Sequence, residues 1–254
     1  MCLLILAFQI HPDYPVIVAA NRDEFFRRPS LPAHFWEDHP EILAGRDLEK
    51  MGTWMGISKS GRFAGLTNFR DPRESTEGKR SRGELVTGAL RFPGPLQEFM
   101  KKLSEQDDQY PGYNLLAGDH QQCYYYSNKE GKVRKLEPGI YGLSNALLDT
   151  PWPKVEFEKK EMVKILKKDN NPRESLFRML SHAEPFPDDQ LPNTGIPVKW
   201  ERKLSPLFIE GKDYGTRCST VVLFGRQEIE FAERNYEKGN QKEYRFRIPL
   251  SDLR

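Results

Sequence analysis

Residues 1–24 read MCLLILAFQIHPDYPVIVAANRDE, and this stretch decides the fold. Two apolar segments, 3–10 and 16–20, flank a His-Pro-Asp turn and predict a pair of strands. Both segments are apolar on both faces, which predicts a sheet that is covered on each side. The second strand ends in the polar residues Asn21, Arg22, Asp23 and Glu24. A hairpin would return these side chains to the start of the first strand.

A cysteine stands at position 2 of the first predicted strand. If Met1 is removed, the Cys2 thiol lies beside an α-amine with a pKa of about 7.7–8.0, close enough to neutrality to act as a base. A nearby arginine would lower the pKa of the thiol, and a carboxylate would orient the amine. The residues alone leave two interpretations open. One is an N-terminal nucleophile, and the other is a small buried cysteine beside a salt-bridged strand end.

The remaining pattern predicts strands, then helices, then strands. A turn is expected at 45–47, and the four prolines of 184–200 predict irregular structure. This order predicts one α+β domain over residues 1–254 whose terminal strands share a sheet. Further strands are expected at 53–58, 62–68, 113–118, 123–127, 133–136, 140–143, 218–224, 228–233 and 243–248. Helices are expected at 81–90, with a capping box from Ser81 to Glu84, and at 95–105, 154–168 and 172–181.

Composition excludes several classes of protein. The chain has 39 basic and 37 acidic side chains, a net charge of +2, so no basic face for nucleic acid is expected. Its three cysteines are far apart and its five histidines lack paired ligand spacing, which predicts neither a disulfide framework nor a metal site. No leader peptide or apolar run of about 20 residues is visible. We expect a cytoplasmic protein with no integral membrane segment and no cofactor.

Other polar residues could carry chemistry. Asn145, in YGLSN (141–145), and Asn68, in LTN (66–68), could each donate an amide N–H to an oxyanion, although both also suit a turn. Arg217, in YGTRCST (214–220), could bind a carboxylate or phosphate, or lie on the surface at a strand start. The loop 70–82 is basic, but its acids are interleaved, so a solvated loop is the simpler interpretation.

Ten short strings occur in one order along nearly the whole chain. They are the Met1-Cys2 start, AANRDEFFRRPS (19–30), AGRD (44–47), GTWMGIS (52–58), LTNFRDP (66–72), RGELV (82–86), GYNLLAGD (112–119), YGLSNALLDTPWPK (141–154), YGTRCSTVVL (214–223) and ERNYE (233–237). With these strings the sequence resembles the NRDE family of transport and Golgi organisation protein 2-like proteins. The resemblance implies the αββα sandwich of the N-terminal-nucleophile hydrolases, whose cysteine amidases also begin with Met-Cys.

The resemblance also implies roles for individual residues. The catalytic set would be Cys2 as nucleophile, Arg22 and Asp23 from the second strand, Asn145 as the oxyanion amide and Arg217 as a distal arginine. The related amidases place their Arg and Asp three residues apart, a spacing that Asn21 and Glu24 share here. Beyond the resemblance, we expect Asn21, Glu24, Asn68 and Arg46 to bind the substrate.

Two functions follow as expectations. The first is an N-terminal-cysteine hydrolase that acts on an amide or thioester bond of a small acyl compound. The alternative is a non-catalytic protein that binds or carries haem, an acyl-CoA or another lipid, with Arg46, Arg217 and the basic loop available for its carboxylates or phosphates. In both cases the expected partner is a small molecule.

Overall fold

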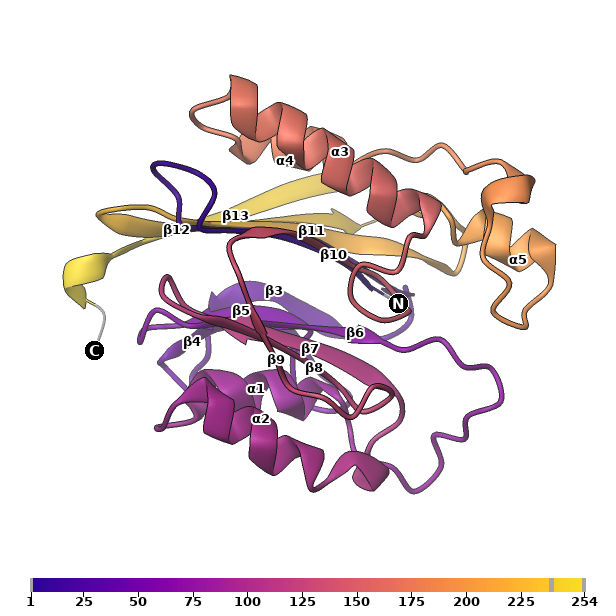
Figure 1. Cartoon of the computed structure of the whole chain (residues 1–254), viewed down its shortest axis with the longest axis horizontal. Helices are drawn as coiled ribbons and strands as arrows, with labels where there is room; N and C mark the ends of the chain where they lie inside the picture. Colours follow the sequence, from indigo (N-terminus) through magenta and orange to yellow (C-terminus); the bar gives the residue numbers. More distant parts are fainter. Residues whose placement is uncertain (1, 238–239, 253–254) are drawn as a thin grey trace.

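The protein is a sandwich of two stacked β-sheets with helices on both outer faces (Figure 1). The structure, a computed structural model, describes residues 2–237 and 240–252, and for Cys2 and Asp252 the backbone alone. The layers are helix, sheet, sheet and helix. This arrangement confirms the predicted α+β class and the predicted αββα sandwich.

The first sheet contains both ends of the described chain, as the sequence predicts. Neighbouring strands are antiparallel throughout. Its last strand, β13, exposes the charged residues Lys242, Glu243, Arg245 and Arg247. In spatial order the strands are β10 (Gly139–Leu143), β1 (Cys2–Phe8), β2 (Val16–Phe25), β11 (Tyr214–Phe224), β12 (Glu228–Glu237) and β13 (Asn240–Pro249).

The second sheet is an antiparallel meander in sequence order. Because each strand pairs with the one that follows it, most connections are short. The strands are β3 (Ser30–Phe35), β4 (Ile42–Asp47), β5 (Met55–Ser58), β6 (Phe63–Asn68), β7 (Tyr113–Gly118), β8 (Cys123–Ser127) and β9 (Arg134–Leu136).

The helices form the two outer layers. Figure 1 shows α3 (Pro153–Lys168) and α4 (Arg173–Leu180) over the first sheet, and α1 (Gly83–Arg91) and α2 (Leu96–Ser104) over the second. The short helix α5 (Val198–Lys203) lies at one end of the sandwich. Single 3-10 turns occupy Asp107–Gln109, Asp188–Gln190 and Leu250–Asp252. None of the helices in the described ranges is long and apolar enough to cross a membrane.

The doubly apolar pattern of the first two strands has the predicted cause. Alternate residues of β1, such as Leu4 and Leu6, join the core between the two sheets. Their neighbours Leu3 and Ile5 join a separate core beneath α3 and α4. Since side chains alternate across a strand, both faces of the sheet must be apolar when both are covered.

The strand register fixes which residues meet at the start of β1. The Cα atoms of Cys2 and Cys218 both pair with that of Arg22, from opposite sides of β2. Between Thr216 and Cys218 the register of β11 shifts, so Arg217 occupies a β-bulge. A bulge bends the strand locally and changes the direction of its extra side chain.

Two local predictions were wrong, those for a turn at 45–47 and for a helix that Ser81 caps. Residues 45–47 are not a turn but the end of β4, because Gly45 is needed for packing: a Cβ there would lie 2.3 Å from the Trp54 ring. Residues 30–35, where the sequence pattern predicts no strand, form β3, whose register shifts between Leu31 and His34, around Pro32. Ser81 does not cap α1 with its side chain, and the helix begins at Gly83. The segment 184–200 is largely irregular, as predicted, apart from the 3-10 turn Asp188–Gln190 and the start of α5 at Val198.

A buried carboxylate lies on the inner face of α3. Glu158 is fully buried against Gly142 of β10, and neither of its carboxyl oxygens has a hydrogen-bond partner in the described structure. Burial raises the pKa of Glu158 well above its ordinary value, although the charge of Lys154, one turn earlier, acts against this shift. Burial also lowers the pKa of Lys154 to about 8. An unpaired buried carboxylate is costly when it is ionised.

We expect Glu158→Gln to gain stability over the wild type as pH rises from 5 to 8. In the unfolded chain Glu158 ionises near a pH of about 4.3, whereas in the fold it holds its proton to higher pH. Its contribution to stability is therefore present below pH ~4.3 and is lost as pH rises through the raised pKa. Each pKa unit between the folded and the unfolded state corresponds to about 1.4 kcal/mol in the free energy of unfolding.

Urea unfolding at the two pH values measures this difference. The control Glu156→Gln removes a half-exposed carboxylate from the same helix and should show no pH-dependent gain. Equal pH dependence in wild type and Glu158→Gln would contradict the interpretation.

Candidate functional site

A cavity of about 370 Å³ opens at the end of the sandwich where β2 leaves the first sheet. Its walls come from β2 and the turn after it, from β4, from β6 and from the basic loop that precedes α1. It brings together four of the residues predicted from the sequence: Arg22, Asp23, Glu24 and Asn68. Its other walls include Arg28, Asp47, Lys50, Trp54, Thr76, Lys79, Arg80, Ser81, Arg82 and Gly83.

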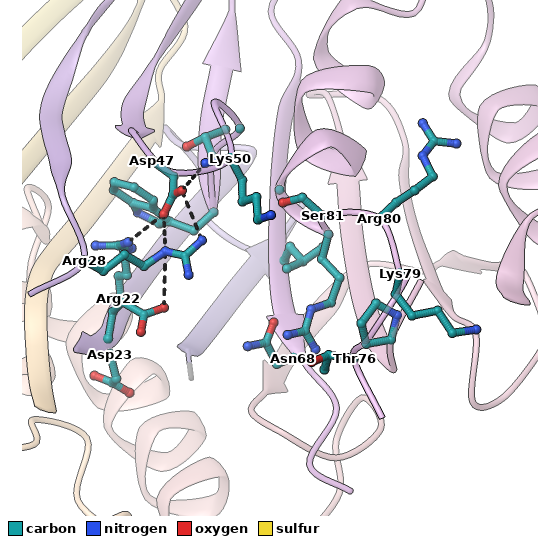
Figure 2. A pocket seen from close by; sticks show the side chains of 18 residues that line it. Arg22, Asp23, Arg28, Asp47, Lys50, Asn68, Thr76, Lys79, Arg80 and Ser81 are labelled. Carbon is teal, nitrogen blue, oxygen red and sulfur yellow. Dashed lines mark hydrogen bonds and ion pairs between the residues drawn. The ribbon is translucent and has the colours of Figure 1, made fainter. Parts of the chain in front are cut away.

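Asp47 joins the two sheets at this cavity. Its carboxylate accepts hydrogen bonds from Arg28 Nε at 2.5 Å, from Arg28 Nη2 at 3.1 Å and from Arg22 Nη2 at 3.4 Å (Figure 2). The backbone N–H groups of Glu49 and Lys50 donate to the same carboxylate. Since Arg22 lies on β2 and Asp47 on β4, the contact spans the interface between the sheets.

Both partners of this contact are constrained. Burial raises the pKa of Asp47, but the hydrogen bonds from Arg28 and Lys50 and the charges of Arg28 and Arg22 outweigh it, so the pKa is lowered overall. The Arg22 guanidinium also lies over the Trp54 ring, 4.1 Å from its centroid. Arg22 is therefore a fixed positive charge in a partly dry wall of the cavity.

Asp23 is almost fully buried at the base of the cavity. Its Oδ1 accepts a hydrogen bond of 2.7 Å from the Thr216 hydroxyl of β11. Burial raises the pKa of Asp23, while the charges of Lys154 and Arg22 and the bond from Thr216 act in the opposite direction. A carboxyl group with a raised pKa beside a cavity is a candidate for proton transfer or for binding an amine.

The two predicted asparagines are joined by a hydrogen bond, but only Asn68 borders the cavity. The Asn145 side-chain amide donates to the backbone carbonyl of Asn68 at 2.8 Å, and Asn145 itself does not border the cavity. The Arg70 backbone N–H donates to the Asn145 carbonyl at 2.7 Å. These contacts fix the end of β6, from which the Asn68 side chain reaches the cavity (Figure 2).

The basic loop borders the cavity, although the sequence favoured a solvated loop. Figure 2 shows Lys79 and Arg80 extending away from Asp47, and Arg80 pairs with Glu84 at 2.6 Å. Lys50, from the turn after β4, extends toward the space between the two walls and forms no ion pair within residues 2–237 and 240–252. Positive side chains therefore outnumber negative ones in the walls of the cavity, and Lys50 is one that no described acid pairs with.

Three predicted residues lie elsewhere. Arg46 pairs with Asp38 and stacks over Trp36 on the outer side of the second sheet. Asn21 is buried under the helix layer, where its amide donates to the carbonyls of Leu180 and Leu207. Arg217 borders a second cavity, separated from the first by the turn after β2. The structure does not bring these side chains to the first cavity.

The side chain of Cys2 lies outside the described part of the structure. Its backbone belongs to β1, and its Cα pairs with that of Arg22, a wall residue of the cavity. Sequence reasoning missed Arg28, Asp47 and Trp54 as site residues. Asp47 and Trp54 stand inside the AGRD and GTWMGIS strings, so a signal was present, but nothing in their spacing tied them to β2.

In the described ranges, no three His, Cys, Asp or Glu side chains are grouped so that they could hold a metal ion. The arrangement instead offers a fixed arginine, a buried carboxyl group and an asparagine amide around one opening. These are the groups that stabilise a developing oxyanion and position an amine.

Sequence comparison connects the chain to named proteins. Residues 1–238 match the family described as Transport and Golgi organisation 2. The Transport and Golgi organization protein 2 homolog of Bos taurus is 37% identical over 257 residues, covering 92% of this chain and 93% of the relative. The Homo sapiens homolog is 36% identical with the same coverage. The Drosophila melanogaster protein is 29% identical over 250 residues, covering 88% and 87%.

Structure comparison identifies the sandwich. The mutant C2A conjugated bile acid hydrolase from Clostridium perfringens aligns with a TM-score of 0.53 at 8% identity, covering 96% of this chain and 92% of that chain. The Caenorhabditis elegans N-acylethanolamine-hydrolyzing acid amidase ortholog aligns with a TM-score of 0.50 at 12% identity, covering 88% and 93%. The likeness is one of fold, and it is the fold of the N-terminal-nucleophile hydrolases.

We expect Asp47→Asn to destabilise the protein by about 2–4 kcal/mol at pH 7, because it leaves the buried Arg22 without its carboxylate. The pKa of Asp47 is lowered in the fold, so its contribution is present above the unfolded pKa of about 3.9 and is lost as pH falls through the folded pKa. The difference between variant and wild type should therefore shrink toward pH 3.

Chemical denaturation at pH 7 and pH 3 gives both values. Asp38→Asn is the matched control, since it removes a carboxylate from an arginine pair whose acid is half exposed. The control should change stability little. A loss of equal size in the two variants would show that the position of Asp47 between the sheets is unimportant.

Proposed function

The chain belongs to the Transport and Golgi organisation 2 family, and we propose that it is an N-terminal-cysteine hydrolase that cleaves amide or thioester bonds. One observation carries the proposal. The register of β1 and β2 sets position 2 opposite Arg22, and Arg22 forms a wall of the first cavity. The fold that the chain shares with N-terminal-nucleophile hydrolases supports it.

The proposed reaction begins once Met1 has been removed. The free α-amine of Cys2 takes the thiol proton, and the thiolate attacks the carbonyl carbon of the substrate. The tetrahedral intermediate collapses, and the leaving amine or thiol departs with the proton from the α-ammonium group. A water molecule, deprotonated by the same amine, then attacks the thioester of the acyl-enzyme. Release of the carboxylic acid restores the thiol.

Arg22 and Asp23 have separate roles in this scheme. Arg22, fixed by Asp47 and Trp54, would favour the thiolate by its charge. Asp23, which accepts the hydrogen bond from Thr216, would orient the α-amine. Burial raises the pKa of Asp23. The charge of a neighbouring ammonium group would act against this shift and stabilise the ionised carboxylate.

We assign the oxyanion amide to Asn68 and a positioning role to Asn145. Asn68 borders the cavity, and Asn145 holds the Asn68 backbone through a hydrogen bond of 2.8 Å. Preorganised donors of this kind stabilise the charge that develops in acyl transfer. Lys50 favours substrates with a polar or anionic group near the scissile bond.

The first test is the mass of the native protein, which must show that Cys2 is the first residue of the mature chain. The purified enzyme is then assayed against a panel of amides and acyl thioesters. Cys2→Ala should abolish turnover, whereas Cys123→Ala, which removes a buried thiol from β8, should retain it. Asn68→Ala should lower kcat by about 100-fold, the usual cost of losing one oxyanion donor.

Two results would count against the proposal. Retention of Met1 in the active protein leaves no free amine beside the thiol, and the route is then closed. Turnover that persists in Cys2→Ala at the wild-type rate would assign the chemistry to another residue.

A further inference from the structure

We propose that Thr216 and Lys154 are positioning residues for Asp23. Thr216 fixes the direction in which the Asp23 carboxylate faces, and Lys154 holds the carboxylate in its charged form. Neither residue borders the first cavity, so both act through Asp23, which does. The inference rests on the proposed hydrolase, in which Asp23 orients the α-amine of Cys2.

The β-bulge of β11 sets Thr216 beside Asp23. Across β11 and β2, Cys218 pairs with Arg22. The next paired residue of β11 is Thr216, which lies opposite Asp23, so Arg217 is the extra residue of the bulge. In a regular strand Arg217 would lie opposite Asp23 instead. The bulge therefore exchanges a guanidinium for a hydroxyl group at this position, while Arg217 donates to three backbone carbonyls of the turn after β2.

The hydrogen bond between Thr216 and Asp23 has a fixed direction. The Thr216 hydroxyl accepts a hydrogen bond from the Ile209 N–H at 2.9 Å, and the Thr216 N–H donates to the Ile209 carbonyl at the same distance. Because an amide N–H can only donate, the single proton of the hydroxyl is left for Asp23 Oδ1, at 2.7 Å. A hydrogen bond that is donated to a carboxylate favours its ionised form.

Lys154 lies over the same face of the first sheet. Its Nζ donates to the Leu204 carbonyl at 2.8 Å, and only 3% of the residue is exposed. The segment that follows Leu204 lies on the helix-layer face of the sheet, where it binds the side chains of Asn21 and Thr216. Asp23 is two residues after Asn21 and therefore faces the same side. One short segment thus holds the Lys154 ammonium group at its start and the Thr216 hydroxyl, with Asp23, at its end.

The buried charges around Lys154 leave Asp23 as its main counter-charge. Burial lowers the pKa of Lys154 to about 8, and the charge of Asp23 acts against this shift. Arg70 and Glu201 also act on Lys154, but they pair with each other at 2.6 Å. Glu158, the remaining acid, has a pKa that burial raises well above its ordinary value. In turn, burial raises the pKa of Asp23, and the charge of Lys154 acts against this shift.

A charged and oriented Asp23 is what the proposed reaction requires. The α-amine of Cys2 becomes an ammonium group when it takes the thiol proton. A carboxylate that is already ionised and fixed stabilises this positive charge without reorganisation, whereas a neutral carboxyl group does not. Thr216 and Lys154 therefore prepare Asp23 from the side opposite to the cavity.

The titration of Asp23 tests the inference without any substrate. Carbon-13 NMR of the aspartate carboxyl groups follows this titration in the full-length protein, and Asp23→Asn identifies the signal by its loss. We expect Thr216→Val and Lys154→Met to move the titration to higher pH, because each removes a group that favours the ionised form. Thr216→Ser keeps the hydroxyl group and should titrate as the wild type does.

Two controls remove the same chemical groups from neighbouring positions. Ser219→Ala deletes a hydroxyl group of β11 that bonds to Asn21. Lys159→Met deletes an ammonium group of α3 that pairs with Asp149 at 2.7 Å. Neither change should move the titration of Asp23.

Turnover separates this inference from the proposed function. On an amide or thioester that the wild type cleaves, Thr216→Val should lower kcat about tenfold, the cost of one hydrogen bond to a charged group, with KM little changed. Thr216→Ser should restore kcat. A wild type without turnover would reject the hydrolase, whereas a shifted Asp23 titration in the variants would still support the two positioning residues.

Three results would overturn the inference. They are an Asp23 titration that is unchanged in Thr216→Val and Lys154→Met, an equal shift in the two controls, and an equal loss of kcat in Thr216→Val and Thr216→Ser. If Lys154→Met does not fold, Lys154→Gln takes its place, since the amide of glutamine can still donate to Leu204 but carries no charge.

Discussion

The carboxylate of Asp47 is the contact on which the candidate site depends. It lies on one sheet and binds Arg22 of the other, while Arg28 and two backbone N–H groups complete its shell. A buried ion pair is a weak source of stability, but removing one partner is costly because the other charge stays buried. The contact therefore links the two sheets at the cavity. The Arg22 guanidinium is therefore preorganised for a ligand.

Much of the fold follows from the sequence, because the strongest signals are local. The continuous apolar runs of β1 and β2 reflect a sheet that is covered on both faces, and the helical spacing of apolar residues in α2 and α3 reflects helices with one covered face. The sequence-based predictions fail where a residue is required for packing against a residue that is distant in the sequence. Gly45 looks like a turn residue, yet it is small because the Trp54 ring lies against it. No local pattern contains that information.

The site was harder to predict than the fold, for a geometric reason. Alternation along β2 separates Arg22, which contacts the second sheet, from Asn21, which contacts the helix layer. The alternation of side chains along a strand is enough to predict that Asn21 and Arg22 lie on opposite faces of the sheet. The bulge at Arg217 could not be predicted in this way. One extra residue in β11 redirects the Arg217 side chain to a different cavity. The partnership of Asp47 with Arg22 joins two sheets, and only the tertiary structure reveals it.

The outermost strand of the first sheet has a consequence for handling the protein. No described strand covers the far side of β13, so its backbone could template an incoming chain. The charges of Lys242, Glu243, Arg245 and Arg247 guard this edge by making close approach of another copy unfavourable. Salt at about 1 M shortens the range of such charges to roughly 3 Å. High salt therefore weakens this electrostatic protection, and edge-to-edge association through β13 is expected to increase with salt concentration.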